Sequence, residues 1–524
     1  MNEVVAPVPR WDAATDEQPA SQAYFMIRTV ALRRGGLTRV MLARLRLYAQ
    51  QGIPVTLLLA FHSPYEEIEE HDIRAAWGLS SLVRFRYFWR EAAPNGGGAA
   101  VESLVHARSE PGLTSFAAEA DERSVSTRLY DNGLLVKRKN YFRDSGQLYR
   151  IDRYDVAGRA NERRYFDSTG CLVRADSVNP ESGNPTLRRF FDRQGDCWLT
   201  VWFDKNHNMR ECVRHLPWAS RYDTYVDCVA EWVEQVLAES PSPVVFGDER
   251  ELDRVLFSLR ESTARRVAVI HNTHTYRNHG EHDPVKPNCQ QLLWHAARLD
   301  SIVLLTSKQR EHLARRFGCE NTRVINHPAP ESLPPHADRR DGVLIAISRF
   351  EERKQLDHAI RAFARALEYV PDAVFEIYGN GPEYARLQRL VTELGVTERV
   401  RFLEFTQRPL EKFSSATASV LTSTFEGFGL VLVEAMAMGT PFVSYDLNYG
   451  PAEVIRDGTD GMLVPQDDIE ALAAGLVRLL GDPQYAQQLG TRAMEVVQRF
   501  SVERWRRDWL ALYAELNPDR AGIS

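Results

Sequence analysis

Two parts of the chain alternate short apolar runs with helical patterns, and this alternation limits the fold more than any other feature. The buried-strand candidates are Ser242–Phe246, Val267–Ile270, Ile302–Thr306, Val343–Ile347, Ala373–Tyr378, Val400–Phe405, Ser419–Thr422 and Pro441–Tyr445. Apolar strands that alternate with helices form parallel, doubly wound sheets, because helices cover both sheet faces. We therefore predict an α/β protein with two Rossmann-like domains. Ligands of such folds bind beyond the carboxyl ends of the strands, here in the cleft between the domains.

The chain opens with a βαβ pattern. Tyr24–Val30 and Val55–Phe61 have the length and apolar character of strands, and a helical pattern covers Val40–Gln50 between them. A glycine pair, Gly35-Gly36, lies in the first βα turn. Residues 64–125 are charged and without clear periodicity, so we expect them to be irregular.

A third region, residues 126–215, follows a different pattern. Short aromatic and β-branched runs alternate with Asx-Gly turn signals, such as Asp131-Asn132-Gly133 and Asp144-Ser145-Gly146, about every 11 to 13 residues. Such turns supply the positive φ that a hairpin needs. The pattern predicts an antiparallel β-meander inserted into the first domain.

The meander is basic within an acidic chain. Residues 127–215 hold 17 Lys or Arg against 12 Asp or Glu, a balance of +5, whereas the whole chain carries −6. Two interpretations stay open: polar strand faces simply carry charge, or the sheet docks an anionic polymer. The sheet also offers a surface for homo-oligomer formation.

These patterns divide the chain into five segments. We predict a first domain in two parts, 22–125 and 216–332, interrupted by the meander at 126–215. A donor-binding domain follows at 340–500. A last helix at 501–520 is expected to return to the first domain.

Composition excludes several classes of protein. The net charge of −6 does not fit a general nucleic-acid binder. The six scattered cysteines include no CxxC pair, which argues against a zinc site or a disulfide framework and fits a reducing cytoplasm. The polar N-terminus lacks the apolar core of a signal peptide, and no apolar run reaches about 20 residues. We expect a cytoplasmic protein that at most contacts the membrane peripherally.

The strongest chemical signal is the segment Glu426-Gly-Phe-Gly-Leu-Val-Leu-Val-Glu434-Ala-Met. A strand ends near Thr422 and a helix starts near Leu430, so helix-start amides and the helix dipole form an anion site. Eight helical residues span about 12 Å, roughly the distance from a sugar to a ribose. Glu426 is thus placed to bind sugar hydroxyls and Glu434 ribose hydroxyls.

A second signal is a pair of basic residues. Arg349 follows a predicted buried strand, and Lys354 lies five residues further on. Two fixed cations can neutralise a diphosphate leaving group, the task that Mg²⁺ performs elsewhere. The nearby Gly379 and Gly381, in Tyr-Gly-Asn-Gly-Pro, are weaker candidates that fit a simple turn equally well.

The first domain offers histidines. Val-Ile-His271-Asn-Thr-His274 ends an apolar strand, which directs His271 toward the cleft. A single histidine there is more often structural, and His274 is the weaker candidate. Gly36 is weak evidence for close approach of a phosphate.

Taken together, these residues resemble the retaining GT-B glycosyltransferases of family 4. The resemblance covers residues 220–515 well and rests on Arg349 with Lys354 and on Glu426–Glu434 around Gly-Phe-Gly-Leu. Ser444-Tyr-Asp-Leu-Asn-Tyr-Gly-Pro451 resembles the subgroup of bacterial wall teichoic acid α-glycosyltransferases and accessory-secretion adhesin glycosyltransferases. That subgroup also carries an inserted β-meander.

The resemblance implies roles for these residues. Arg349 and Lys354 would hold the donor diphosphate, Glu426 the transferred sugar and Glu434 the ribose. His271 corresponds to the family's cleft histidine and Gly36 to its donor-side glycine. Phe428, Gly429 and Leu430 would offer backbone amides. No metal and no other cofactor is implied beyond a UDP-sugar as co-substrate.

Several activities are compatible with this pattern. The preferred hypothesis is transfer of glucose or N-acetylglucosamine from a UDP-sugar to a polyol-phosphate polymer with retention. The alternative within the same class is O-glycosylation of a Ser/Thr-rich protein acceptor. A non-catalytic GT-B binding partner would have lost the residues above, and a nucleotide-sugar epimerase would have no use for the meander.

Overall fold

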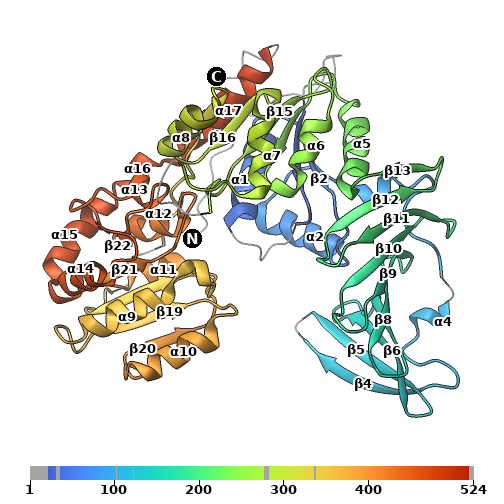
Figure 1. Ribbon diagram of the computed structural model, residues 1–524, viewed down its shortest axis with the longest axis horizontal. Helices are drawn as coiled ribbons and strands as arrows, with labels where there is room; N and C mark the ends of the chain where they lie inside the picture. Colours follow the sequence, from blue (N-terminus) through green and yellow to red (C-terminus); the bar gives the residue numbers. More distant parts are fainter. Residues whose placement is uncertain are drawn as a thin grey trace, which may run out of the picture.

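The computed structural model describes residues 22–30, 36–101, 103–121, 123–276, 282–334 and 338–518. Within these residues it contains two lobes built on parallel sheets and an antiparallel sheet that extends from the first lobe (Figure 1). The predicted fold class is confirmed: two Rossmann-like domains, the first with an inserted β-meander.

The first lobe is a parallel sheet covered by helices on both faces. Its strands in spatial order are β17 (Thr322–Val324), β16 (Ser301–Leu304), β15 (Arg265–Val269), β14 (Val244–Gly247), β1 (Ala23–Ile27), β2 (Val55–Leu59) and β3 (Val83–Tyr87). Its helices are α1 (Gly36–Gln50), α2 (Glu66–Trp77), α3 (Phe88–Glu91), α5 (Tyr225–Leu237), η1 (Arg250–Leu252), α6 (Asp253–Ser258), α7 (Pro287–Trp294), η2 (Ala296–Arg298) and α8 (Ser307–Phe317). The short α4 (Ser103–His106) lies beside the antiparallel sheet instead (Figure 1).

The central strands of this sheet are buried on both faces, which explains their continuous apolar sequences. Every residue of β1 and β2 is buried. Helix α5 starts at a capping box in which Thr224 and Asp227 bond to each other's backbone amides. The sequence therefore specifies both the interior and the start of this covering helix.

The second lobe repeats this design. Its parallel strands in spatial order are β20 (Val400–Leu403), β19 (Val374–Tyr378), β18 (Val343–Ile347), β21 (Ala418–Leu421), β22 (Phe442–Tyr445) and β23 (Met462–Val464). Its helices are η3 (Glu352–Lys354), α9 (Leu356–Ala366), α10 (Tyr384–Glu393), α11 (Pro409–Ser414), α12 (Leu430–Ala437), α13 (Pro451–Val454), α14 (Ile469–Gly481), α15 (Pro483–Ala493) and α16 (Val496–Arg499).

The final helix, α17 (Val502–Leu516), leaves the second lobe and packs against the first. Its buried residues Trp505, Trp509, Leu512 and Tyr513 belong to the hydrophobic core of the first lobe. The Tyr48 hydroxyl of α1 donates to the Trp509 carbonyl at 3.2 Å. The chain thus returns to the first lobe with its last described helix.

The inserted sheet is a continuous antiparallel meander. Its strands are β4 (Thr114–Ala120), β5 (Ser124–Asp131), β6 (Leu134–Phe142), β7 (Leu148–Tyr154), β8 (Ala160–Phe166), β9 (Leu172–Val178), β10 (Pro185–Phe191), β11 (Cys197–Phe203), β12 (Met209–Arg214) and β13 (Ser220–Tyr222). The sheet therefore extends beyond 126–215 at both ends. Its added strands, β4 and β13, lie at the sheet edges and bury little apolar surface, so neither shows a clear apolar alternation.

Repeated aspartates close the hairpins of the meander. Asp155, Asp167, Asp192 and Asp204 each accept backbone N–H bonds from residues two and four positions on. The turns contain a residue with positive φ, which is usually glycine. A further turn at Asn179–Gly183 accounts for the double spacing in the sequence pattern.

Residues 64–125 are more regular than expected. They include α2, the edge strand β3 and the first meander strand β4. Helix α2 is rich in Glu and buries Ile73 with two of its glutamates, so its apolar periodicity is weak. None of the described helices has the length and apolar character needed to cross a bilayer.

Candidate functional site

The second-lobe part of the site forms where the loops after β18 and β21 meet. Lys354 Nζ lies 2.5 Å from Glu426 Oε1, and the Ser423 hydroxyl donates to the same oxygen at 2.7 Å. The backbones are also joined, because the Thr422 hydroxyl donates to the Lys354 carbonyl at 2.9 Å. Two motifs about 70 residues apart in sequence therefore form one unit, as the carboxyl ends of adjacent parallel strands should.

This ion pair is largely removed from water. The side chains of Lys354 and Glu426 are 15% and 12% exposed. Burial alone would raise the pKa of Glu426, but the Lys354 ammonium and the Ser423 hydroxyl outweigh burial and lower it. Glu426 is thus a carboxylate at neutral pH. Both bonds use Oε1, which leaves Oε2 as an acceptor for hydroxyl groups.

Arg349 lies on the same loop but does not join this pair. Its side chain is 67% exposed and contacts Glu351, with Nη1 2.8 Å from Oε1. The same carboxylate also binds Arg353 Nε at 2.7 Å. The structure therefore brings Lys354 to Glu426 and leaves Arg349 as an exposed cation at the carboxyl end of β18.

Gly379 and Gly381 explain how the Arg349 loop is supported. A Cβ at Gly379 would lie 1.9 Å from the Ser348 carbonyl oxygen, and one at Gly381 would lie 2.4 Å from that of Phe350. The Ser348 and Phe350 amides bond to this glycine turn. Close packing of two backbones accounts for both glycines, and a direct role in donor binding remains a prediction.

The Gly427–Leu430 turn lies against the first lobe. A Cβ at Gly427 would lie 2.2 Å from the His271 carbonyl oxygen, so only glycine permits this approach. Gly429 has φ of 83° and precedes α12. The Phe428 ring is buried among the rings of His327 and Phe500, so only its backbone can serve a ligand.

The start of α1 faces α12 across the lobe boundary. A Cβ on Gly36 would lie 2.6 Å from Leu430 Cδ1, and Gly35 is outside the described residues. One turn further along α1, Arg39 Nη1 lies 3.1 Å from Glu434 Oε1. Burial raises the pKa of Glu434, and Arg39 opposes this effect.

Two buried, oppositely charged side chains, Asp248 and Arg44, hold the ring of His271 in place. His271 Nε2 lies 2.6 Å from Asp248 Oδ1, and Asp248 is also bonded to Arg44 Nη2. Arg44 and Asp248 are completely buried. The guanidinium group of Arg44 lies 4.5 Å from the ring centre of Trp509 and 5.1 Å from that of Phe25. Helix α17, which supplies Trp509, therefore helps to fix Arg44 and, through Asp248, His271.

The contact with Asp248 determines which nitrogen of His271 carries the proton. Burial would raise the pKa of Asp248, but Arg44 and His271 lower it to about 2, so the ionised carboxylate can only accept. Burial lowers the pKa of His271 although Asp248 opposes this, so the ring is neutral at pH 7. Nε2 must then carry the hydrogen. Nδ1 is an unprotonated acceptor that is buried and has no partner among the described residues.

The described residues hold no group of three His, Cys, Asp or Glu arranged to bind a metal ion. The expectation that no metal is needed rests on the two cations, Arg349 and Lys354, and it remains a prediction.

Comparison with known proteins identifies the architecture. Residues 334–496 match the family Glycosyl transferases group 1. The whole chain also resembles the crystal structure of a mutant of S. aureus TarM in complex with fondaparinux, alpha-GlcNAc-glycerol and UDP. The TM-score is 0.76 at 18% identity, with 94% of this chain and 100% of that chain covered. The fold is GT-B.

Two further similarities cover most of the GT-B chain. The pneumococcal O-GlcNAc transferase GtfA in complex with UDP and GlcNAc has a TM-score of 0.75 at 16% identity, over 95% of this chain and 99% of that chain. A poly(glycerol-phosphate) alpha-glucosyltransferase of Bacillus subtilis (strain 168) is 23% identical over 520 residues, 94% of this chain and 74% of the relative. The similarities therefore include the inserted meander.

Sequence reasoning missed several residues at or behind the contact between the lobes. Nothing in the sequence around Arg39, Arg44 and Asp248 distinguishes them from other charged residues. The only signal for Arg44 is weak: the largely apolar helix α1 contains three arginines. Lys286 Nζ lies 4.0 Å from the ring centre of Phe425 across the lobes, and burial lowers its pKa to about 8. His274 is fully buried beside Gln309 and Tyr449, which places it in the lobe contact.

Proposed function

We propose that the protein is a retaining glycosyltransferase that transfers glucose or N-acetylglucosamine from a UDP-sugar to a polyol-phosphate polymer. One observation carries the proposal: in a GT-B fold, the buried Lys354–Glu426 pair lies beside the Gly427–Leu430 turn, and that turn packs against the backbone of His271. These groups offer a cation for a diphosphate and hydrogen-bond acceptors for sugar hydroxyls.

The second lobe would stabilise the leaving group. As the bond between the sugar C1 and the diphosphate breaks, negative charge grows on the diphosphate oxygen. Lys354 and the exposed Arg349 can neutralise that charge, and the first amides of α12 add the positive end of a helix dipole. The acceptor oxygen would attack C1 from the side the diphosphate leaves, and its proton would pass to the departing phosphate. No protein nucleophile is required.

The first lobe would orient the sugar. With Nε2 donating to Asp248, the buried Nδ1 of His271 is left as the acceptor that a hydroxyl of the transferred sugar would use once the donor enters between the lobes. Glu426 Oε2 can accept from a second hydroxyl. Two acceptors from opposite lobes would hold the sugar only when the lobes are together, which limits hydrolysis of the donor by water.

The meander supports an anionic acceptor. Glu162 is shared by Arg153, Arg164 and Arg189, whose side chains are 34–44% exposed while that of Glu162 is 18% exposed. Asp152 is shared in the same way by Arg150 and Arg163. Each carboxylate is outnumbered by guanidinium groups, so positive charge remains on the sheet. Phosphodiesters are the matching ligand chemistry.

The relatives support the same substrate class. The names of the Bacillus subtilis enzyme and of the TarM complex refer to poly(glycerol-phosphate) and to UDP with a glycerol-linked GlcNAc. GtfA is named as an O-GlcNAc transferase, which keeps a protein acceptor as the alternative to test.

A transfer assay tests the proposal. The full chain is incubated with UDP-glucose or UDP-N-acetylglucosamine and one of three acceptors: poly(glycerol phosphate), poly(ribitol phosphate) or a Ser-rich peptide. We expect labelled sugar on a polyol-phosphate polymer, with an α-anomeric proton signal in the product. Transfer to the peptide alone would contradict the proposed acceptor. Conversion of the UDP-sugar without any acceptor would indicate an epimerase and contradict the proposed reaction.

A further inference from the structure

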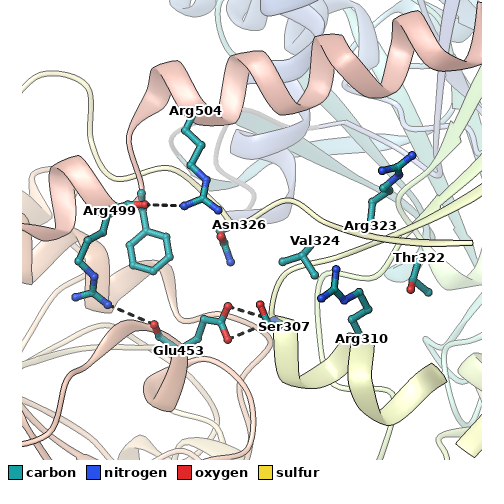
Figure 2. Close-up of a pocket in the computed structure, with 10 residues that line it drawn as sticks. Ser307, Arg310, Thr322, Arg323, Val324, Asn326, Glu453, Arg499 and Arg504 are labelled. Carbon is teal, nitrogen blue, oxygen red and sulfur yellow. Dashed lines mark hydrogen bonds between the residues drawn. The ribbon is translucent and has the colours of Figure 1, made fainter. Parts of the chain in front are cut away.

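A second basic cavity lies between the lobes, on the side where the chain crosses from one lobe to the other. Its volume is about 570 Å³, within the usual range of small-ligand sites. Figure 2 shows Arg310 and Arg323 of the first lobe on one side and Arg499 and Arg504 on the other, with Asn326, Ser307 and Glu453 between them. None of these residues belongs to the Lys354–Glu426 site.

The cavity has more positive charge than its own residues neutralise. Glu453 is the only acidic residue among those that line it. Arg323 pairs with Glu515, and Arg499 pairs with Asp460 at 3.0 Å, both outside the lining. The nearest carboxylate to Arg504 is that of Asp508 at 3.7 Å.

Arg310 has still fewer contacts. Within the described part of the chain, its guanidinium group has no hydrogen-bond or ion-pair partner. Its side chain extends from α8 toward the space between Asn326 and Glu453 (Figure 2). The cavity thus contains one unpaired guanidinium group and one weakly paired group, Arg504, on facing walls.

Glu453 occupies the position that an anionic ligand would take. Both of its carboxylate oxygens accept from the Ser307 amide at the start of α8, at 3.2 and 3.3 Å. The carboxylate comes from the second lobe and the helix from the first, so this contact links the lobes. Helix starts attract anions generally, and here a side chain of the protein supplies one.

We propose that this hinge cavity, defined by Arg310, Arg323, Arg499, Arg504 and Glu453, binds a phosphate-bearing ligand that competes with Glu453. Guanidinium forks on facing walls match phosphate oxygens in charge and geometry. The ligand carries several negative charges, because one phosphate would leave much of the arginine charge unmatched. Binding would replace a contact within the protein by a bridge between both lobes and α17.

The test measures binding without any sugar donor, so its outcome is independent of the proposed transferase activity. Tripolyphosphate is titrated calorimetrically into the full chain and into Arg310→Ala/Arg504→Ala. We expect the double variant to bind at least about tenfold more weakly. The matched control, Arg315→Ala/Arg507→Ala, removes exposed arginines of the same two helices outside the lining and should change binding by less than about twofold.

Glu453→Gln gives the specific signature of the cavity. This variant removes the competing charge and should strengthen tripolyphosphate binding severalfold, whereas binding at the Lys354 loop would not respond. Equal affinity in all variants, or absence of binding, would overturn the proposal. Repeating the titration with a sugar bisphosphate and with a poly(glycerol phosphate) oligomer distinguishes the ligand's source: tighter binding of the first indicates a small metabolite, and tighter binding of the second indicates a polymer segment.

Discussion

The two lobes contribute unlike halves of the candidate site. The second lobe presents a charged pair, Lys354 and Glu426, on neighbouring loops close to the contact between the lobes. The first lobe presents a neutral imidazole, His271, whose supporting charges on Asp248 and Arg44 are completely buried. In the proposed reaction, the second lobe would supply charge for the leaving group, and the first would supply a fixed direction for the sugar.

This difference indicates how each half tolerates change. Removing one partner of a buried ion pair leaves an uncompensated charge, which typically costs about 3–5 kcal/mol of stability. The neutral ring of His271 depends on one hydrogen bond to a charged group, Asp248, for its orientation. Losing a bond of this kind costs about 1.5–3 kcal/mol. The comparison predicts large losses of activity for changes in the second lobe and intermediate losses for changes in the first. Changes at the Arg39–Glu434 contact, the rim of the site, should have small effects.

The largest effect is expected from the second lobe. Lys354→Ala and Glu426→Ala should each reduce transfer by at least about a hundredfold, because charge stabilisation of a leaving group of this kind is typically worth that much. Initial rates at saturating donor measure the loss. Near-normal turnover in either folded variant would refute this half of the site.

A double variant separates this loss from loss of folding. Lys354→Met/Glu426→Gln removes both charges and leaves no unpaired buried ion, so its melting temperature should stay closer to that of the wild type than that of Lys354→Ala. It should nevertheless be inactive. Activity in the double variant would show that the pair is structural.

The first lobe is tested by Asp248→Asn. The amide can donate to Nε2, so the imidazole proton is no longer held there and Nδ1 is no longer a reliable acceptor. We expect kcat/KM of the folded variant to fall about 10- to 150-fold, the equivalent of one charge-assisted hydrogen bond. The change also leaves the buried Arg44 guanidinium without its counter-charge, so the melting temperature should fall as well.

Monodeoxy donors show whether Asp248 acts through His271. In the wild type, the donor that lacks the hydroxyl bound by Nδ1 should react more slowly. In Asp248→Asn, the same donor should lose little further, since the bond is already gone. Additive losses for every deoxy donor would mean that Asp248 only stabilises the fold.

The same contrast explains what the sequence could predict. The Lys354 and Glu426 motifs are local: each follows a strand, and adjacent parallel strands bring them together. Arg44, Asp248 and His271 come from separate elements, more than 200 residues apart at the extremes, so no spacing pattern connects them. Arg349 was predicted from the same pattern as Lys354, yet the two differ in burial, because Glu351 holds Arg349 at the surface. Whether a charge is buried depends on packing, which spacing does not reveal.

A smaller effect is expected at the rim, where Arg39 holds Glu434. If Glu434 binds the ribose, its carboxylate must be shared between Arg39 and the nucleotide. Arg39→Ala should then change UDP affinity by no more than about fivefold, because an exposed pair is worth at most about 1 kcal/mol. The direction should be tighter binding, measured by UDP titration. Glu434→Ala should weaken binding; if it does not, Glu434 serves only the lobe contact.

The smallest effect is expected from metal removal, which tests whether the cations of the second lobe are sufficient to neutralise the departing diphosphate. If Lys354 and Arg349 carry the charge of the departing diphosphate, EDTA should leave the transfer rate unchanged within about twofold, while the Lys354 variant loses it. An absolute Mg²⁺ requirement would contradict this account. The second lobe would then act by holding a metal–diphosphate complex, and Glu426 would have to serve the metal as well as the sugar. Added Mg²⁺ that restores activity to Lys354→Ala would locate that metal beside the missing ammonium group.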